Sequence, residues 1–588
     1  MKPRDQLDPE PSGVTRRSFV IDGAAALAVG AIGGRVLRRA PRARALTSSQ
    51  MQALQALGRS TMRVPGSLPN AALPAGVDTM PEIEHVVVLM MENHSYDNLL
   101  GMLGREKGQY PRGDGFAIAG DGVPTASNPY ADGTPQRAFR MPTTCQLDGK
   151  PSQEWEQSHI QYANGRCDGF VISQSGPVAM GYWTGEDLPF TYDLATRFPI
   201  GDRWFSSLLG QTDPNRRYLI AATSTGMTDD IGASIGGLLP DVSYVLPLGG
   251  TIFNSLSAAG ISWIDYYTTF PSGTTAELYP VFDTLSSLQY AKPIAQFFTD
   301  AAAGTLPSFS LVDPDYDTQS QEDPQNIVVG EAFLGRVVEA VGGSPAWRKT
   351  MLVITYDEHG GYYDHVPPPV ALAPDGLGPI VQPGESTYDG FTRYGFRVPA
   401  IVVSPYAKRD YISHLIYDHT AILAFLERKW NLPALTYRDA NANDLTDFLD
   451  LGAMARGQPT FPELAPLAAS GETPATLACS TTGPGAIPPP ATPVTPSPPG
   501  VLARYLGRRP RLRGLLLELR TTQGTLTDLR VELYHGTRVL ASARIARATP
   551  AEHRFVLRSR GKIPPHGRYV LVVRQGSRRL LRRALTVD

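Results

Sequence analysis

Cysteine is scarce in this chain of 588 residues, which contains Cys145, Cys167 and Cys479 and no others. Three cysteines cannot form the multi-bridge framework of a small secreted domain, and their spacing matches no zinc-ligand pattern. Cys145 and Cys167 are able to pair in an oxidising compartment, and free buried thiols are an equal alternative. The fold must therefore depend on a hydrophobic core, which the 42% of hydrophobic residues can supply.

Long apolar runs and an excess of one charge are also missing. Beyond the N-terminus no stretch is long enough to span a membrane as a helix, which takes about 20 apolar residues. The net charge of −2 excludes a chain that is basic overall. The length is too great for one small domain, so we expect one large domain and an accessory domain.

The N-terminus matches the pattern of an export signal. It contains Thr15-Arg16-Arg17-Ser18-Phe19, a short apolar run over 24–33 and a cleavage pattern at Ala43-Arg44-Ala45. This combination is typical of the twin-arginine pathway, and the alternatives are a disordered basic tail or an uncleaved anchor. We predict that residues 1–45 are a signal peptide and that the protein is secreted, periplasmic or held at the cell envelope.

Changes in composition divide the rest of the chain. Residues 46–80 are expected to be a flexible lead-in, and residues 81–480 are expected to form the large domain. Residues 481–500 are rich in Pro, Ala, Thr and Gly and predict an extended linker. Residues 501–588 contain alternating strand-like runs separated by Gly and Pro, which predict a small β-sandwich.

The segment 501–588 is strongly basic. It contains about 20 Arg and Lys residues and about 5 acids, which leaves a charge of about −17 for the rest of the chain. Such a domain is expected to attract an anionic membrane or a cell-wall surface. The simpler alternative is that the arginines keep a small domain soluble. Nucleic acid is not an expected partner of an exported protein, and the sequence indicates no oligomeric state.

The large domain shows the rhythm of an α/β fold. Continuous apolar runs at 86–91, 351–354 and 400–403 predict buried strands. Apolar residues at helical spacing predict helices near 333–341 and 419–430. Alternating strands and helices predict a mostly parallel sheet sandwiched by helices.

Two of the expected strands run directly into side chains that carry oxygen. Glu92 and Asn93 follow the first strand, and Asp357 and Glu358 follow the second. Ligands bind at the carboxyl ends of strands in open α/β sheets, so we expect both pairs at one edge. Carboxylate and amide oxygens favour a hard divalent ion such as calcium or magnesium. The alternative is that these side chains are solvated or cap helices.

A third segment adds a hydroxyl group. Asp213 is expected to cap a helix that begins at Pro214, which places Thr212 immediately before the helix N-terminus. Free N–H groups and the helix dipole bind phosphate at such a position. A bound metal would lower the pKa of the Thr212 hydroxyl and make it a nucleophile, with Asn215 and Arg216 supporting the phosphate. The alternative is an ordinary Asp-Pro turn.

Several motifs together resemble one family. They are Glu92-Asn93-His94-Ser95-Tyr96-Asp97, Gly210-Gln211-Thr212-Asp213-Pro214-Asn215-Arg216, the segment from Tyr356-Asp357-Glu358-His359-Gly360-Gly361 to Pro368, Arg397-Val398-Pro399-Ala400, and Tyr417-Asp418-His419-Thr420. Over about residues 83–430 the chain is similar to bacterial phospholipases C and related acid phosphatases, which have an alkaline-phosphatase-like fold.

This resemblance implies a metal site and a nucleophile. The implied ligands of one divalent metal ion are Glu92, Asn93, Thr212, Asp357 and Glu358. Ca²⁺ is the expected ion, with Mg²⁺ or another ion as the alternative. Thr212 is implied to be the residue that becomes phosphorylated.

Two positions depart from the family's pattern. Gln153 stands where the family usually has a histidine, and Asp323 replaces the histidine of an acidic-His-Pro-Pro motif. Those histidines are expected to touch the phosphate or the leaving oxygen, so Gln153, Asp323 and the remaining His159 are candidate substrate-binding residues. Their loss puts the rate and the pH optimum in question and leaves the metal ligands intact. His365 and His419 are expected to be structural.

Three functions fit the sequence. The leading hypothesis is a phospholipase C that hydrolyses a phospholipid phosphodiester through a phospho-threonine. The second is a phosphatase that acts on small phosphomonoesters, because both reactions use the same phosphate site. The third is a surface-binding protein of the same fold with weakened catalysis, which the two missing histidines favour and the intact Thr212 opposes.

Overall fold

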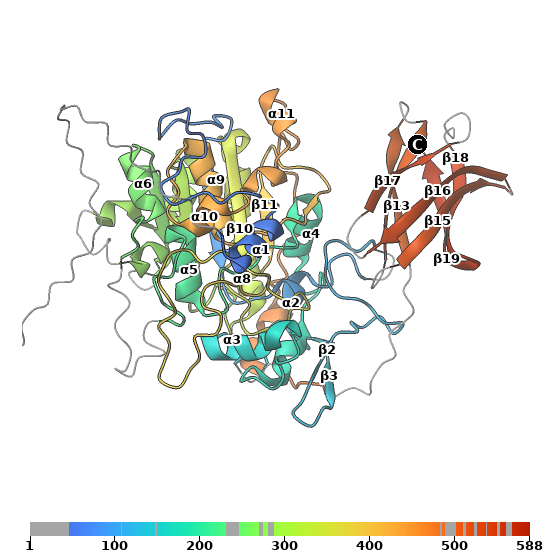
Figure 1. Ribbon diagram of the computed structural model, residues 1–588, viewed down its shortest axis with the longest axis horizontal. Coiled ribbons are helices and arrows are strands. Elements are labelled where there is room, and N and C mark those ends of the chain that lie inside the picture. Colours follow the sequence, from blue (N-terminus) through green and yellow to red (C-terminus); the bar gives the residue numbers. More distant parts are fainter. Residues whose placement is uncertain are drawn as a thin grey trace, which may run out of the picture. The chain divides into compact units, whose positions relative to one another are not determined.

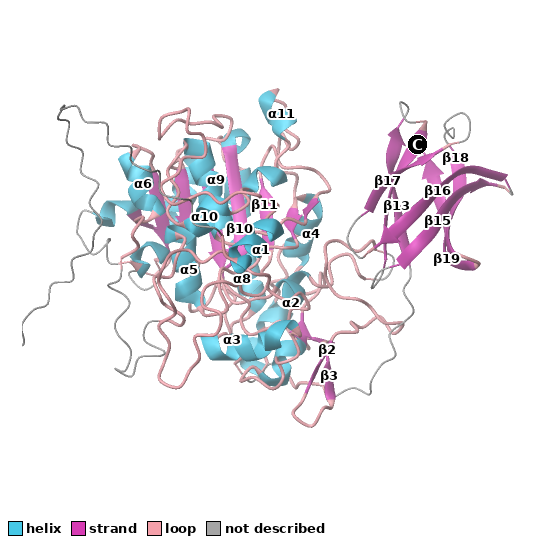
Figure 2. Ribbon diagram, viewed as in Figure 1, coloured by secondary structure: helices cyan, strands magenta, loops and turns pink. Residues whose placement is uncertain are grey.

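The computed structural model describes residues 46–588 apart from several short segments. Those segments are residues 107–108, 148–149, 231–245, 270–273, 280–286, 483–484, 489–500, 510–512, 522–525, 537, 550–552, 560–566 and 588. The expected signal peptide at 1–45 and most of the expected linker at 481–500 therefore lie outside the described residues. Figure 1 shows how the described elements follow one another along the chain, and Figure 2 distinguishes helices from strands.

A sheet of eight described strands forms the centre of the large domain, in the order β12-β6-β11-β10-β1-β9-β7-β8. Its strands are β1 (His85–Met91), β6 (Ile200–Gly201), β7 (Trp263–Tyr267), β8 (Ala291–Pro293), β9 (Phe309–Val312), β10 (Thr350–Tyr356), β11 (Ala400–Val403) and β12 (Ile412–Ser413). β10, β1, β9, β7 and β8 are parallel, and β11 runs antiparallel to β10 and β6. The prediction of a mostly parallel α/β sheet is confirmed.

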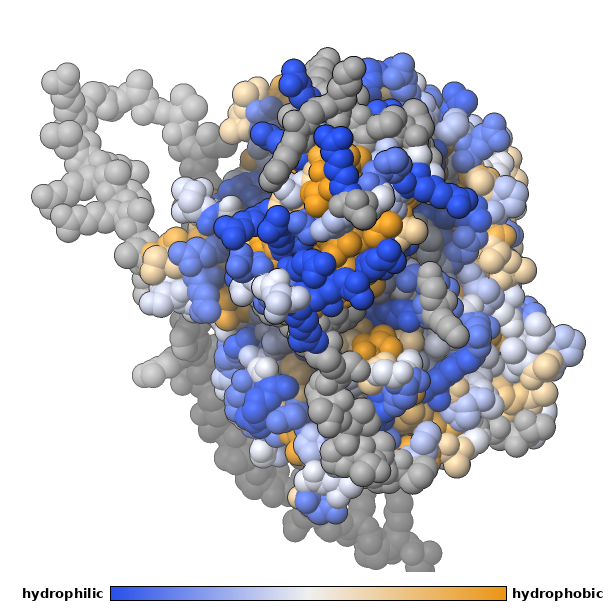
Figure 3. Space-filling view, turned by 90° about the vertical axis from the view of Figure 1, so that its right-hand side faces the viewer, coloured by the Kyte–Doolittle hydropathy of each residue, from blue (hydrophilic) through white to orange (hydrophobic). Residues whose placement is uncertain are grey.

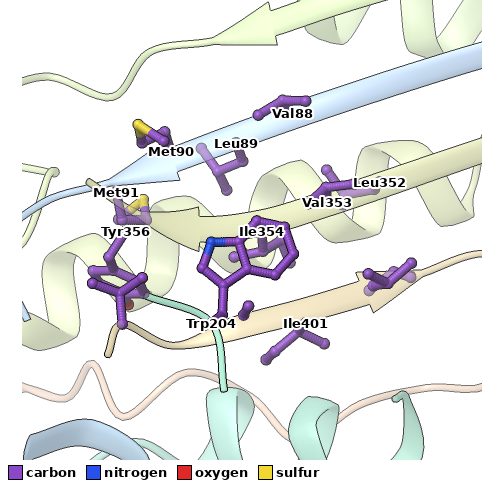
Figure 4. Packing of buried hydrophobic residues seen from close by; sticks show 14 of the residues in the cluster. Val88, Leu89, Met90, Met91, Trp204, Leu352, Val353, Ile354, Tyr356 and Ile401 are labelled. Carbon is purple, nitrogen blue, oxygen red and sulfur yellow. The ribbon is translucent and has the colours of Figure 1, made fainter. Parts of the chain in front are cut away.

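The central strands β1 and β10 pair in parallel and end in register, because Met91 lies opposite Tyr356. Residues 86–91 of β1 have no exposed side chain, as expected for a strand that is covered on both faces. Figure 4 shows the two strands side by side, with Trp204 among the apolar side chains that pack there. Since the strands end together, the residues that follow them begin at the same edge of the sheet.

Helices flank the sheet (Figure 2). They are α1 (Ser48–Ala56), α2 (Tyr96–Leu100), α3 (Trp155–Tyr162), α4 (Pro189–Arg197), α5 (Thr212–Ala221), α6 (Ile252–Ala258), α7 (Ile294–Ala303), α8 (Ile327–Gly342), α9 (Thr420–Trp430), α10 (Tyr437–Asn441), α11 (Leu451–Ala455), α12 (Pro474–Leu477) and α13 (Cys479–Thr482). Four short strands complete this domain: β2 (Ser127–Pro129), β3 (Pro135–Arg137), β4 (Phe139–Arg140) and β5 (Gly181–Tyr182). The helices expected near 333–341 and 419–430 are confirmed as α8 and α9. In the described part of the chain no helix has the length and hydropathy needed to cross a membrane.

Helix α5 begins two residues earlier than the sequence indicates. Gln211 is its N-cap residue and Thr212 its first residue, whereas the expected start was Pro214 with Asp213 as the cap. The Gln211 side chain makes no capping hydrogen bond. The Asp213 N–H instead donates to the Asp230 carboxylate at 2.7 Å. The Asp230 carboxylate, from another segment of the chain, therefore accepts an N–H group of the first helical turn, which is the capping role expected for Asp213.

Residues 501–588 form two antiparallel sheets of their own, in the orders β13-β14-β17 and β16-β15-β18-β19. The strands are β13 (Val501–Arg509), β14 (Gly514–Thr521), β15 (Leu526–His535), β16 (Arg538–Ala548), β17 (His553–Arg558), β18 (Gly567–Gln575) and β19 (Arg578–Val587). A separate hydrophobic cluster joins the two sheets, with Leu517, Val531 and Leu571 fully buried. The predicted small β-sandwich is confirmed.

The segment 46–80 differs from the flexible lead-in that its composition suggests. The Arg59 guanidinium donates to the Asn441 carbonyl, and the Asn431 amide donates to the carbonyls of Asn70 and Leu73. The Asn431 side chain, at the end of α9, thus satisfies backbone carbonyls of this mostly irregular segment, and the Arg59 side chain of the segment binds a backbone carbonyl of α10. These contacts hold it against the large domain.

The disulfide joins Cys145 to Cys479, whose Cα atoms are 5.8 Å apart. The suggested pairing of Cys145 with Cys167 is therefore wrong, and Cys167 is a buried free thiol. Helix α12, which immediately precedes the helix of Cys479, lies against the loop that contains Thr144, whose hydroxyl donates to the Thr476 carbonyl at 3.1 Å. Because the two cysteines are 334 residues apart in the sequence, their spacing could not predict that they pair.

Candidate active site

The two pairs of oxygen-bearing residues meet where β1 and β10 end. Glu92 and Asn93 directly follow β1, and Asp357 and Glu358 directly follow β10. The Asn93 N–H donates to Asp357 Oδ1 at 3.1 Å, which joins the two loops. All four residues are at most 4% exposed. The structure therefore brings these residues together in the interior, at one edge of the sheet.

Oxygen atoms converge on the Asn93 side chain. Its Oδ1 lies 3.2 Å from the Thr212 hydroxyl oxygen. The site that this Oδ1 atom occupies is 3.1 Å from Asp357 Oδ1 and 2.7 Å from Glu358 Oε1. Turning the amide over would direct its NH₂ group at the same three oxygens. The first orientation suits a site that holds a cation, and the second suits the protein without one.

Arg216 is the cation on the inner side of this cluster. Its guanidinium nitrogens lie 3.1 Å from Asp357 Oδ2, 3.5 Å from Glu92 Oε1 and 3.3 Å from Asp313 Oδ1. The guanidinium also lies over the Tyr316 ring, 4.9 Å from its centroid. Its side chain is 2% exposed. The structure thus shows Arg216 as the buried counter-ion of the carboxylates, and its expected contact with a phosphate stays a prediction.

Thr212 is the accessible member of the group. It is partly exposed, whereas Glu92, Asn93, Asp357 and Glu358 are buried. It is also the first residue of α5, a helix whose residues from Pro214 to Ala221 are all buried. A molecule that approaches from solvent therefore reaches the Thr212 hydroxyl before it reaches the carboxylates.

Asn215 holds the turn that presents Thr212. Its Oδ1 accepts the backbone N–H groups of residues 207–208, and its amide donates to the carbonyls of Gly210 and Gln211. The side chain is fully buried, and these four bonds use its whole hydrogen-bonding capacity. The structure therefore shows Asn215 as a positioning residue, and its expected contact with phosphate also stays a prediction.

The N-terminus of α5 offers less to an anion than the sequence indicates. The Asp213 N–H is already bound to Asp230, and Pro214 has no N–H. Two of the first three helical positions thus have no free N–H group for a phosphate. An anionic substrate at Thr212 needs a further source of positive charge.

Two glycines allow the loop after β10 to pass close to the loop after β1. Gly360 and Gly361 have φ values of 64° and 73°. A Cβ atom on Gly360 would overlap the carbonyl oxygen of Asn93, and one on Gly361 would lie 2.7 Å from the backbone of Ser152. Both the dihedral angles and the space therefore require glycine. This explains the Gly-Gly pair in the motif that begins at Asp357.

Burial and mutual repulsion make the charged forms of the site's carboxylates unfavourable. Burial raises the pKa of Glu92, Asp357 and Glu358, and for Glu358 the neighbouring Asp357 carboxylate raises it further. Glu92 Oε2 is buried without a hydrogen-bond partner among the described residues. A divalent ion among these oxygens would satisfy Glu92 and offset the repulsion between the carboxylates. Because every donor is an oxygen atom, the residues present fit a hard ion such as Ca²⁺ or Mg²⁺.

A second acidic group consists of Asp97, Asp364 and His365, whose ligand atoms lie within 4.8 Å of one another. The Arg397 guanidinium contacts Asp97 at 3.1 Å and Asp364 at 2.9 Å. His365 Nδ1 lies 2.6 Å from Asp97 Oδ2. These contacts occupy the carboxylates, and the buried Arg397 charge opposes a metal ion at this position. The group is an ion-pair network, and the structural role expected for His365 fits it.

The three other candidate substrate residues have contacts of their own. Gln153 is buried just before α3. His159 stacks on the Tyr388 ring with centroids 3.8 Å apart, and burial lowers its pKa to about 4. Asp323 is buried and accepts a hydrogen bond from the Tyr362 hydroxyl at 2.9 Å. Within the described residues no recorded contact joins Gln153, His159 or Asp323 to Thr212, so their contact with substrate stays a prediction.

The residues behind Arg216 were not predicted from the sequence. Asp313 directly follows β9, the parallel neighbour of β1. Besides its ion pair with Arg216, Asp313 Oδ1 accepts hydrogen bonds from the hydroxyls of Thr275 at 2.7 Å and Tyr316 at 2.9 Å. The rule that found the other acids applies here as well, because Asp313 stands at the carboxyl end of a buried strand.

Comparison with known proteins decides the family, since residues 83–433 match the sequence profile of the Phosphoesterase family. The chain belongs to the phosphoesterase family. The sequence resemblance noted above is thereby confirmed. Membership makes the protein a hydrolase of phosphoric ester bonds.

Individual relatives of this phosphoesterase carry phospholipase C names. It is 30% identical over 430 residues to non-specific phospholipase C3 of Arabidopsis thaliana. The matched region covers 66% of this chain and 78% of that protein. It is 32% identical over 425 residues to non-specific phospholipase C6 of the same plant, covering 66% and 76%. Phospholipase C A of Mycobacterium tuberculosis is 30% identical over 411 residues, covering 62% and 77%.

The His365 network should make the stability of the phosphoesterase depend on pH. Burial alone would lower the pKa of His365, but the carboxylates of Asp97 and Asp114 outweigh it and raise the pKa to about 9. Protonated His365 stabilises the folded state fully below its unfolded pKa of about 6.5, and this contribution is lost as the pH rises through about 9. We expect the melting temperature, measured by calorimetry, to fall across that interval.

The variant His365→Gln should melt at a lower temperature near neutral pH and should lose most of this dependence. His535→Gln, in the C-terminal domain, is the matched control and should keep it. An undiminished fall in His365→Gln would assign the effect to another group.

Proposed function

We propose that this phosphoesterase is a metal-dependent phospholipase C that hydrolyses a phospholipid phosphodiester. The observation that carries the proposal is the partly exposed Thr212 hydroxyl, 3.2 Å from Asn93 Oδ1 at the margin of a buried cluster of oxygen ligands. A nucleophile held beside a cation site supplies the positioning and the charge stabilisation that phosphoryl transfer needs. The relatives named phospholipase C support the choice of substrate.

In the proposed reaction the Thr212 oxygen attacks the phosphorus atom of the phospholipid. The bond between phosphorus and the glycerol oxygen breaks, and diacylglycerol leaves as an alcohol with the proton that the hydroxyl gives up. The head-group phosphate is now a diester of Thr212. Water then attacks the phosphorus atom, the phosphorylated head group leaves, and a proton from water restores the Thr212 hydroxyl.

The chain's own residues prepare this chemistry. Asn215 fixes the turn before Thr212, and Arg216 compensates the buried negative charge. The proposed metal ligands are Glu92, Asn93, Thr212, Asp357 and Glu358. An ion bound there would lower the pKa of the hydroxyl and screen the charge of the phosphate. We propose Ca²⁺, with Mg²⁺ as the ion of similar oxygen preference.

The remaining candidate residues are assigned to the substrate in this proposal. Gln153, His159 and Asp323 would contact the phosphate or the leaving group. Arg216 would add its positive charge from behind the carboxylates, and Asn215, whose hydrogen bonds are all made within the turn, would support the phosphate by positioning Thr212. Since burial lowers the pKa of His159 to about 4, that ring would act as a neutral hydrogen-bonding group. Burial raises the pKa of Asp323 well above its usual value, which favours a protonated carboxyl that can donate a hydrogen bond.

We also propose that the protein works outside the cytoplasm after export through the twin-arginine pathway, with residues 1–45 as the signal. The disulfide between Cys145 and Cys479 supports this placement, because disulfides persist in oxidising compartments. The basic C-terminal domain is proposed to hold the enzyme at an anionic surface.

Two soluble esters test the substrate class. A phospholipase C should show a higher kcat/KM with p-nitrophenylphosphorylcholine than with p-nitrophenyl phosphate. Its substrate is a phosphodiester, so its site must accept a second ester group on the phosphate, which the monoester lacks. Release of p-nitrophenol reports both reactions. A preference for the monoester would replace the proposal by a phosphatase, and no release from either ester would leave the surface-binding alternative.

The nucleophile is tested by Thr212→Val, which removes the hydroxyl and keeps the shape of the side chain. We expect kcat to fall at least about a thousand-fold, as is typical when a covalent nucleophile is lost, with an unchanged melting temperature. Mass spectrometry of quenched wild-type enzyme should detect the added head-group phosphate on Thr212. Thr134→Val, on an exposed turn between β2 and β3, is the control. Wild-type turnover in Thr212→Val would exclude the mechanism.

The metal site is tested through its effect on stability. A ligand that binds only the folded state stabilises it by about 2.7 kcal/mol at a hundred times its dissociation constant, so calcium should raise the melting temperature of metal-free protein. Glu358→Gln should lose most of that rise. Glu322→Gln removes an acid that pairs with Lys150 at 3.1 Å near the surface and should retain it. A full calcium effect in Glu358→Gln would place the ion elsewhere.

A further inference from the structure

The four-stranded sheet of the C-terminal domain has an inner and an outer face. Val531 of β15 and Leu571 of β18 are fully buried in the cluster shared with the other sheet. Successive side chains of a strand point to opposite faces, so their sequence neighbours project from the side away from that core. This side, formed by β16, β15, β18 and β19, is called the outer face below.

A row of arginines crosses the outer face. Arg530 of β15 lies opposite Arg544 of β16 and opposite Arg574 of β18. Arg574 in turn lies opposite Arg579 of β19. Opposed residues of antiparallel strands have Cβ atoms about 5 Å apart. Because strands are spaced about 4.8 Å apart, the row gathers four guanidinium groups along about 14 Å.

The four side chains are available to a ligand. Arg530 and Arg574 are 58% and 37% exposed. Arg544 and Arg579 are exposed as well. Figure 3 shows blue hydrophilic side chains gathered beside orange hydrophobic areas on the side that faces the viewer. Among the described residues of 501–588 no large apolar side chain is exposed. Such a surface favours electrostatic attachment over insertion into an apolar partner.

The next row of outward-facing residues, which contains Glu532, offsets only part of the positive charge of the four arginines. Glu532 lies 2.9 Å from the Arg530 guanidinium and 3.9 Å from that of Arg574. Arg582, opposite Val572 in the same row, adds another positive charge. Like charges directly opposite one another destabilise a sheet. The arrangement is therefore unfavourable for the isolated domain and becomes favourable when an anionic ligand lies across the row.

We propose that the outer face binds the phosphate groups of an anionic phospholipid bilayer. Guanidinium groups offer paired N–H donors that match phosphate oxygens, and the sheet presents four of them to a planar array of head groups. This inference rests on the proposed phospholipase C function for the choice of lipid as the anion. A face that holds the bilayer would keep the enzyme at its substrate and raise the local substrate concentration.

Two variants of equal charge test the face. The face variant carries Arg544→Gln, Arg574→Gln and Arg579→Gln, and the control variant carries Arg509→Gln, Arg513→Gln and Arg558→Gln. The control positions are exposed and belong to β13, β17 and the turn before β14. The face variant retains the 2.9 Å pair between Arg530 and Glu532, which limits its effect on folding.

Binding is measured by co-sedimentation of the full chain with vesicles. The vesicles contain either equimolar phosphatidylglycerol and phosphatidylcholine or phosphatidylcholine alone. Every protein also carries Thr212→Val, so that no lipid is consumed. Each arginine near an anionic surface changes the partition about five-fold, so the face variant should lose at least about ten-fold in binding to the anionic vesicles. The control variant should bind like the parent, and raising the salt concentration should weaken binding of both.

Other outcomes overturn the proposal. Equal losses in the two variants would show that overall charge, and not this row, attracts the membrane. Absence of binding to anionic vesicles at low salt, including the case in which the chain binds an isolated anionic cell-wall polymer, would reject the bilayer as the partner. Hydrolysis of p-nitrophenylphosphorylcholine is measured in parallel on the chain that keeps all of its arginines and native Thr212. If this chain hydrolyses the ester and its Thr212→Val form does not bind anionic vesicles, the face alone is rejected. If the Thr212→Val form binds vesicles and the native chain does not hydrolyse the ester, the proposed function alone is rejected.

Discussion

The ion pairs of Arg216 are the constraint on which the site depends. Three strands of the central sheet deliver buried carboxylates to one edge, and Glu92, Asp357 and Asp313 all contact this guanidinium. Each unpaired buried charge would cost several kcal/mol. Arg216 and Thr212 are four residues apart on α5, so they lie on the same side of that helix. The helix that neutralises the interior therefore also presents the hydroxyl, and the position of one fixes the position of the other.

The surrounding loops are adapted to this arrangement. Gly360 and Gly361 let two loops approach so closely that a side chain at either position would strike the backbone, and Asn215 uses four hydrogen bonds to hold the turn before Thr212. These features keep three oxygen-bearing side chains around Asn93 despite the repulsion between the two carboxylates among them. A site of fixed geometry with an excess of negative charge is suited to a cation, and a cation bound beside Thr212 would supply the positive charge that the helix N-terminus offers only in part.

Much of the large domain was predictable because its strands are buried on both faces. The apolar runs at 86–91 and 351–354 and the acids that follow them placed four residues of the site correctly at one sheet edge. Sequence reasoning applied that rule to two strands and overlooked Asp313 after a third. The start of α5 was misplaced by two residues, because the carboxylate that binds the Asp213 N–H comes from Asp230 and not from the helix itself.

The sequence by itself determined the α/β class, the basic β-sandwich and the oxygen chemistry of the site, since these follow from local patterns of hydropathy and residue type. Only the tertiary structure decided the partners. Cys145 pairs with Cys479 across 334 residues, Arg216 faces carboxylates, and Arg530, Arg544, Arg574 and Arg579 share one row. Such contacts depend on strand register and on chain crossings between distant segments, and pairings of that kind leave no signal in the local sequence.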